Sequence, residues 1–97
     1  MTLTDLRYIV ALARERHFGR AAEKCFVSQP TLSVAVKKLE EELGVILFER
    51  SPQEVRVTPV GQRIVAQAGK VLAEAAQVAE IAAADKGPLV GPLRLGV

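Results

Sequence analysis

The chain has 97 residues, 49% of them hydrophobic and 25% charged, a balance typical of one small globular domain with room for an appendage. No apolar run approaches the ~18 residues of a membrane-spanning helix, and no charged-then-apolar leader opens the chain. One cysteine, Cys25, and one histidine, His17, are too few for an internal disulfide, a Cys/His zinc site or a Cys–His catalytic pair. The net charge of +2 does not by itself indicate a nucleic-acid partner.

The distribution of charge is more informative than its sum. Residues 16–38 contain five basic residues and one acidic residue, a local charge of +4, whereas residues 39–49 contain four glutamates and no base, a local charge of −4. Basic residues gathered on one face are typical of a site for a polyanion. Two solvated helix surfaces would produce the same counts.

The first half of the chain predicts two helices and a corner. Thr2 and Asp5 have the spacing of a capping box, so a helix should begin there, and the apolar residues that follow it repeat with helical spacing. A second, short helix should begin at about residue 18 or 19. Its inner side should carry Ala21, Ala22 and Cys25, and the base of the corner should be filled by Phe26 and Val27.

The third predicted helix has clear ends. Ser28 is a suitable N-cap, Pro30 fits the first turn, and Gly44 supplies the stop. Its inner face carries Leu32, Val36, Leu39 and Leu43. Its outer face carries Pro30, Val34, Lys37 and Glu41, flanked by Ser33 and Lys38. Nothing in the stability of a helix explains an apolar residue such as Val34 on the outer face.

Two β-like runs follow, at residues 45–49 and 55–58, and the turn-forming residues 51–54 separate them. A two-stranded hairpin is not stable alone, so Leu47 and Phe48 should dock on the helical core. Three helices closed by a hairpin is the order of a winged helix-turn-helix, a mainly α fold. We therefore expect a winged helix-turn-helix domain over residues 1–58.

A long helix is expected over residues 59–86, with Thr58 as N-cap and Pro59 in its first turn. Its apolar residues repeat every 3.5 positions, the spacing of a coiled-coil seam. The seam consists of Ile64, Ala68, Val71, Ala75, Val78 and Ala82. The seam could pack on the head of the same chain, but the helix is too long for that, so we expect it to pair with a second copy. Residues 87–97 look like a hinge and the start of a further domain.

The residues favour binding over catalysis. The chain lacks a glycine-rich phosphate loop and a serine with a basic partner motif, so we expect no enzyme, no cofactor and no metal. Cys25 beside two alanines is more typical of a small core residue than of a reactive thiol.

The third helix suits double-stranded DNA. Its capped N-terminus can face a phosphate, Gln29 can pair with adenine, and Pro30 and Val34 can meet thymine methyl groups. The glutamates at residues 40–42 should then point away from DNA. The candidate DNA-contacting residues are Ser28, Gln29, Pro30, Thr31, Ser33, Val34, Lys37 and Lys38 of the helix, and Arg50, Ser51, Gln53 and Arg56 of the hairpin.

These residues carry a resemblance to a known family. The run AAEKCFVSQPTLSVAVKKLEEELGVILFERS, followed by VTPVG, looks like the DNA-binding head of LysR-type bacterial transcriptional regulators. The likeness covers residues 1–61, and the long helix extends it to residue 86. Within the family the head is most similar to the peroxide-responsive activators of the oxidative-stress response.

The resemblance implies more than the spacing does. It implies a cytoplasmic transcription regulator that dimerises through antiparallel linker helices, assembles into tetramers on promoter DNA, and has RNA polymerase as a candidate further partner. It also implies base contacts by Gln29, Pro30 and Ser33, with the hairpin in the minor groove. Val34 departs from a frequent arginine and Gln53 from a frequent basic residue, which leaves the base preference open. The alternatives are a LysR-type regulator of another signal, or a helical protein-interaction module whose basic face is incidental.

Overall fold

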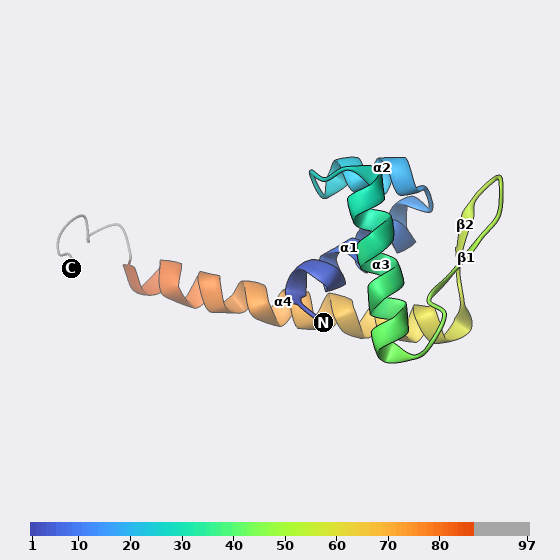
Figure 1. Ribbon diagram of the computed structural model, residues 1–97. Coiled ribbons are helices and arrows are strands. Elements are labelled where there is room, and N and C mark those ends of the chain that lie inside the picture. Colours follow the sequence, from blue (N-terminus) through green and yellow to red (C-terminus); the bar gives the residue numbers. More distant parts are fainter. Residues whose placement is uncertain (87–97) are drawn as a thin grey trace.

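The computed structural model describes residues 1–86, which form a compact head and one long helix projecting from it (Figure 1). The elements in chain order are α1 (Leu3–Glu15), α2 (Phe18–Lys24), α3 (Gln29–Leu43), β1 (Phe48–Arg50), β2 (Val55–Val57) and α4 (Pro59–Lys86). This order confirms the predicted winged helix-turn-helix, a mainly α fold. The expected hinge at residues 87–97 lies outside the described part of the chain.

The helices begin and end where local chemistry predicts. At α1 the Thr2 hydroxyl accepts from the Asp5 amide at 3.1 Å, and the Thr2 amide donates to the Asp5 carboxylate at 3.1 Å, which completes the capping box. At α3 the Ser28 hydroxyl accepts from the Thr31 amide at 3.2 Å. The same helix ends at Gly44, whose φ of 73° is left-handed.

The core lies between α1, α2, α3 and the first half of α4, and the start of the hairpin closes it. Its largest fully buried side chains are Ile9, Leu12, Leu32, Val36, Leu39 and Leu47. Leu47 and Phe48 are both buried, so the predicted docking of the hairpin on the helices is confirmed.

The hairpin is shorter than its sequence pattern suggests. Its strands are antiparallel, with Phe48 opposite Val57 and Arg50 opposite Val55. The expected strands at residues 45–49 and 55–58 are wrong at three ends, and before Phe48 and after Val57 the backbone makes hydrogen bonds outside the strand ladder. The Thr58 hydroxyl donates to the carbonyl oxygen of Ile46 at 2.6 Å, and the Thr58 amide donates to that of Leu47 at 3.0 Å.

The corner between α2 and α3 corrects a prediction. Phe26 does not fill the base of the corner: its side chain is 94% exposed, and its φ of 59° is left-handed. This conformation reverses the chain within one residue and leaves the ring in solvent, while Ala21 and Ala22 are buried and Val27 packs against the core. Cys25, placed on the inner side by its sequence context, is only half-buried at the end of α2.

The long helix has two halves with different surroundings. Ala68 is 2% exposed within the core, and Ile64 and Leu72 pack against the same cluster. The expectation that Ala68 belongs to a seam between two copies is therefore corrected, because the head of its own chain covers that side chain; Ile64 is half-buried, and its place in such a seam stays a prediction. Farther along α4, Val78 and Ile81 are 70% and 68% exposed, since the helix extends past the head there (Figure 1).

Candidate nucleic-acid interface

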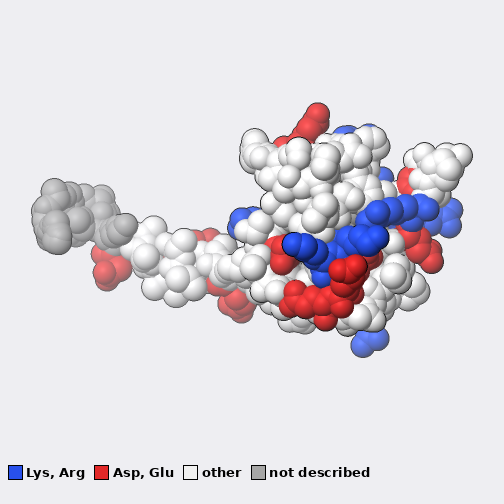
Figure 2. All heavy atoms as spheres, viewed as in Figure 1, with Lys and Arg blue, Asp and Glu red and all other residues white. Residues whose placement is uncertain are grey.

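The outer face of α3 and the hairpin form one continuous surface of the head. Figure 2 shows Lys and Arg side chains in a band that crosses the head between α3 and the hairpin, with acidic side chains directly beside it. The near-zero total charge thus separates in space as well as in sequence. The basic band marks this face as a candidate site for a polyanion.

The structure brings the predicted DNA-contacting residues to this surface. All of them are exposed except Ser33, which is half-buried. Val34 is 55% exposed on α3, as its position in the helical repeat predicts. An apolar side chain kept in water on this face is available for a methyl group of a base.

The N-terminus of α3 uses two of the predicted contact residues for its own cap. The Ser28 hydroxyl donates to the Thr31 hydroxyl at 2.8 Å and accepts from the Thr31 amide. The Leu32 amide donates to the carbonyl oxygen of Ser28 at 3.1 Å, and Pro30 has no amide hydrogen. Among the described residues the Gln29 amide has no acceptor, so it remains the donor of the first turn that can face a phosphate.

The hairpin holds its candidate residues in different ways. The guanidinium of Arg50 lies over the ring of Phe18, 4.7 Å from its centroid, which is a cation–π contact. The Ser51 hydroxyl donates to the carbonyl oxygen of Glu54 at 2.9 Å and so shapes the turn. Arg56 pairs with Glu54 at 3.2 Å on the exposed side of the hairpin. Gln53 is exposed in the same turn.

Two residues that the sequence interpretation did not assign to this site help to build it. Phe18 positions Arg50, and only the fold brings the start of α2 beside the hairpin. Glu40 was expected to point away from DNA, but it is half-buried, and one of its carboxylate oxygens accepts from the amides of Leu47 at 2.8 Å and Phe48 at 3.1 Å. Glu42 is also engaged, with the N-terminal ammonium of Met1 at 2.8 Å.

Other features of the described residues concern the single cysteine, the single histidine, metal ligands and membrane-spanning helices. Burial raises the pKa of the Cys25 thiol, against an opposing effect of Arg7. His17 caps α2, because its Nδ1 accepts from the Arg20 amide at 3.1 Å. Over residues 1–86 no three His, Cys, Asp or Glu side chains gather as metal ligands would, and none of the described helices has the length and apolarity to cross a membrane.

The chain is similar to known proteins both in sequence and in structure. The family model described as bacterial regulatory helix-turn-helix protein, lysR family, matches residues 3–62. The DNA-binding transcriptional dual regulator OxyR of Escherichia coli strain K12 is 48% identical over 97 residues, which is 100% of this chain and 32% of that protein. The chain therefore spans about a third of the length of the curated relatives it matches.

Solved structures are similar in the same region. A full-length OxyR variant from Pseudomonas aeruginosa superposes with a TM-score of 0.85 and 69% identity, over 90% of this chain and 30% of that one. The BenM DNA-binding domain in complex with benA site 1 DNA superposes with a TM-score of 0.83 and 38% identity, over 91% of this chain and 99% of that one.

Proposed function

Because this chain belongs to the lysR family of bacterial regulatory helix-turn-helix proteins, we propose that it binds double-stranded promoter DNA, with α3 in the major groove and the hairpin in the minor groove. The observation that carries the proposal is the exposed N-terminal part of α3, where the exposed Gln29, Pro30 and Val34 precede two exposed lysines on the same helix. Side chains at the start of a recognition helix reach base edges, and the basic residues beside them bind phosphates.

The regulatory role that we propose is that of a peroxide-responsive activator. Its support is the 48% identity to OxyR of Escherichia coli and to a relative named hydrogen peroxide-inducible genes activator. A regulator of this kind would act on DNA in the bacterial cytoplasm, with RNA polymerase as a further partner, and the chain itself would have no catalytic role. Sensing of peroxide is not assigned to Cys25, whose thiol is half-buried and has a raised pKa.

We also propose that the chain acts as a homodimer through the second half of α4, and as a tetramer in the longer protein. The support is the exposed apolar stripe of Val71, Val78 and Ile81, together with the half-buried Ala75 on the same side. A helix that presents large apolar side chains to water along nearly three turns gains stability by packing against a second helix. The two short side chains, Ala75 and Ala82, would allow the partner helix to approach closely.

The salt dependence of DNA binding tests the main proposal. A duplex selected from a random library by the chain should bind with an affinity that falls steeply as salt rises, because each neutralised phosphate releases counterions. Selected and random duplexes should differ in affinity by ~10³-fold or more. An affinity that does not change with salt concentration, or equal affinity for both duplexes, would contradict sequence-specific DNA binding. Either result would favour the protein-interaction module instead.

A further inference from the structure

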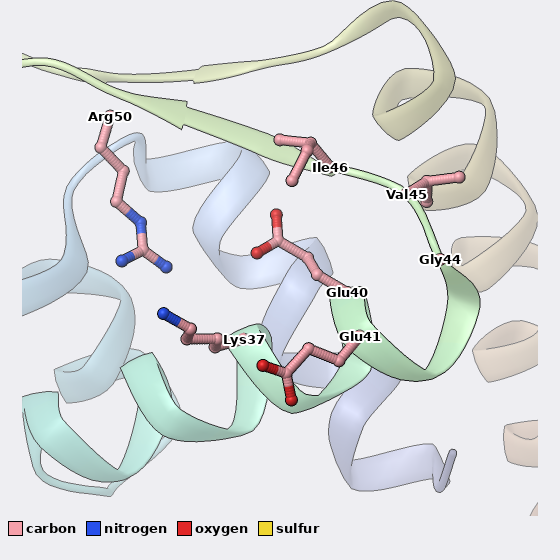
Figure 3. A pocket seen from close by; sticks show the side chains of 7 residues that line it. All are labelled: Lys37, Glu40, Glu41, Gly44, Val45, Ile46 and Arg50. Atoms are coloured by element: carbon pink, nitrogen blue, oxygen red, sulfur yellow. The ribbon is translucent and has the colours of Figure 1, made fainter.

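A groove separates α3 from the segment that enters the hairpin. It has a volume of about 460 Å³. Its lining consists of Lys37, Glu40, Glu41, Gly44, Val45, Ile46 and Arg50 (Figure 3). One wall is therefore the recognition helix and the other is the base of the wing, so a ligand in this groove would contact both DNA-binding elements at once.

Two cations face each other across the groove. Figure 3 shows the ammonium of Lys37 and the guanidinium of Arg50 pointing toward one another from opposite walls. Neither side chain takes part in any ion pair within residues 1–86. Two like charges that converge without a carboxylate between them repel each other, and an anion between them would relieve that repulsion.

Neighbouring groups hold the Arg50 guanidinium and the two walls of the groove in place. The Phe18 ring supports the Arg50 guanidinium at 4.7 Å, which leaves the N–H groups at the edge of the guanidinium free to donate. Glu40 lies three residues after Lys37 on α3, and its carboxylate accepts from the amides of Leu47 and Phe48 at the base of the wing. The bonds of Glu40 thus set the separation of the two walls.

We propose that Lys37 and Arg50 form a clamp for a single DNA phosphate, and that Glu40 positions it. This inference rests on the proposed function. When a recognition helix occupies the major groove and a wing the adjacent minor groove, the sugar–phosphate strand that divides the two grooves passes between helix and wing. The clamp stands at that passage, with planar donors from Arg50 and a point charge from Lys37 for one phosphate group.

Glu41 indicates that the clamp binds a phosphate of a DNA strand rather than a free phosphate ion. Its exposed carboxylate lines the same groove and repels a small anion as strongly as it repels a DNA phosphate. A DNA strand is held by further contacts along α3 and the hairpin and overcomes this repulsion, whereas a free phosphate ion has no other contacts. Inorganic phosphate should therefore compete with DNA no better than sulfate at equal ionic strength.

Counterion release distinguishes one shared phosphate from two separate ones. With the selected duplex, a plot of log affinity against log salt has a negative slope. The magnitude of this slope should decrease by at most about 0.9 in Lys37→Ala and in Arg50→Ala, and by about 0.9 in the double variant as well. The matched control is Lys38→Ala, whose side chain lines a different groove. Combined with Lys37→Ala it should reduce the magnitude of the slope by about 0.9 more than Lys37→Ala alone does, because Lys38 neutralises a separate phosphate.

A scan with methylphosphonate, which removes the charge of one phosphate at a time, locates the clamp. One position should weaken binding of the wild-type chain and have a reduced effect on both single variants. A slope that falls by about 1.8 in the Lys37→Ala/Arg50→Ala variant, or two different sensitive positions, would overturn the clamp while leaving the proposed function intact. Failure of the wild-type chain to bind any duplex would overturn both.

The positioning role of Glu40 has its own test. In Glu40→Gln the amide oxygen can accept from the same two backbone amides, so the salt slope should stay at the wild-type value. Glu40→Ala should lower the slope in the wild-type chain but not in Arg50→Ala, because the clamp is already lost there. If Glu40 were purely structural, Glu40→Ala would lower the melting temperature in both backgrounds, and its effect on the salt slope would be the same with and without Arg50. That result would overturn the positioning role of Glu40.

Discussion

Gln29 is exposed at the first position of α3, and its side chain makes no hydrogen bond within residues 1–86. A glutamine in this place can pair with an adenine through both its amide oxygen and its nitrogen. Ser28 and Thr31, its neighbours, instead use their hydroxyls to cap the helix. Of these three polar side chains, Gln29 is the one available to read a base without a cost to the fold.

We predict that Gln29→Ala loses discrimination at one base pair of the half-site, by about 1–3 kcal/mol. Competition between the selected duplex and its single-base variants measures the change. Ser28→Ala is the contrasting variant: removal of the N-cap should destabilise the head by about 1 kcal/mol in urea unfolding. A base-reading role for Gln29 would be refuted if Gln29→Ala weakened binding to selected and random duplexes equally.

Cys25 should be an unreactive thiol. Burial raises its pKa, so at pH 7 the thiolate, which is the reactive form, is a smaller fraction than in a free cysteine. We predict that alkylation by iodoacetamide is slower than for glutathione at the same pH, and that peroxide leaves DNA affinity unchanged. Cys25→Ser is the control. A peroxide effect on DNA affinity that this variant abolishes would contradict the structural interpretation.

Among the elements, α4 has one position near its start, Gly61, where an added side chain would collide with the rest of the head. A Cβ at Gly61 would collide with the carbonyl oxygen of Leu47 and come within 2.9 Å of the Thr58 hydroxyl oxygen. This close approach allows the Gly61 amide to donate to that hydroxyl at 2.9 Å. The hairpin and α4 are thereby joined through Thr58, whose side chain is buried.

We predict that Gly61→Ala destabilises the head by about 1–3 kcal/mol, because the backbone contact must open. The matched control is Gly69→Ala in the same helix, where an added Cβ has no neighbour within 4 Å. That substitution should instead stabilise the chain by about 0.5–1 kcal/mol, since alanine has the higher helix propensity. Urea unfolding of the two variants, at equal protein concentration, measures both changes.

An apolar residue replaced by aspartate should have different effects in the two halves of α4. Ile81→Asp places a charge on an exposed position and should leave the head folded while it turns the dimer into a monomer. Ala68→Asp buries an unpaired carboxylate in the core and should unfold the head. Sedimentation equilibrium and circular dichroism separate the two results, and an unchanged mass for Ile81→Asp would argue against dimerisation through this stripe.

At the scale of the molecule, the fold separates charges that the sequence places side by side. The glutamates after Lys38 do not form one repulsive surface, because Glu40 turns inward to the hairpin, Glu42 pairs with the N-terminal ammonium, and Glu41 stays exposed. The acidic end of α3 therefore braces the wing as well as limiting the anion site. We expect Glu41→Gln to raise the affinity for random duplex, by about 0.3–1 kcal/mol at low salt, measured against Lys38→Gln as the opposite change of charge.

Much of this arrangement could be predicted from local sequence. The caps at Thr2, Ser28 and Gly44 and the outward position of Val34 depend on residues within one or two helical turns, so their pattern is visible without the fold. The ends of the strands could not be predicted in this way, because they depend on Thr58 and Glu40, whose side chains bind the backbone from elsewhere in the chain. The position of Phe26 also escaped prediction, since one left-handed residue turns its ring outward.

The sequence by itself determined the winged helix-turn-helix order, the exposed outer face of α3 and the long helix, because caps, glycine stops and apolar repeats act over short distances along the chain. Only the tertiary structure decided which partners those elements meet. It divided the apolar seam of α4 between its own head and the solvent, and it brought Phe18, Lys37 and Arg50 to one groove. Contacts between residues far apart in sequence leave no periodic pattern in any one segment, so the clamp became visible only in three dimensions.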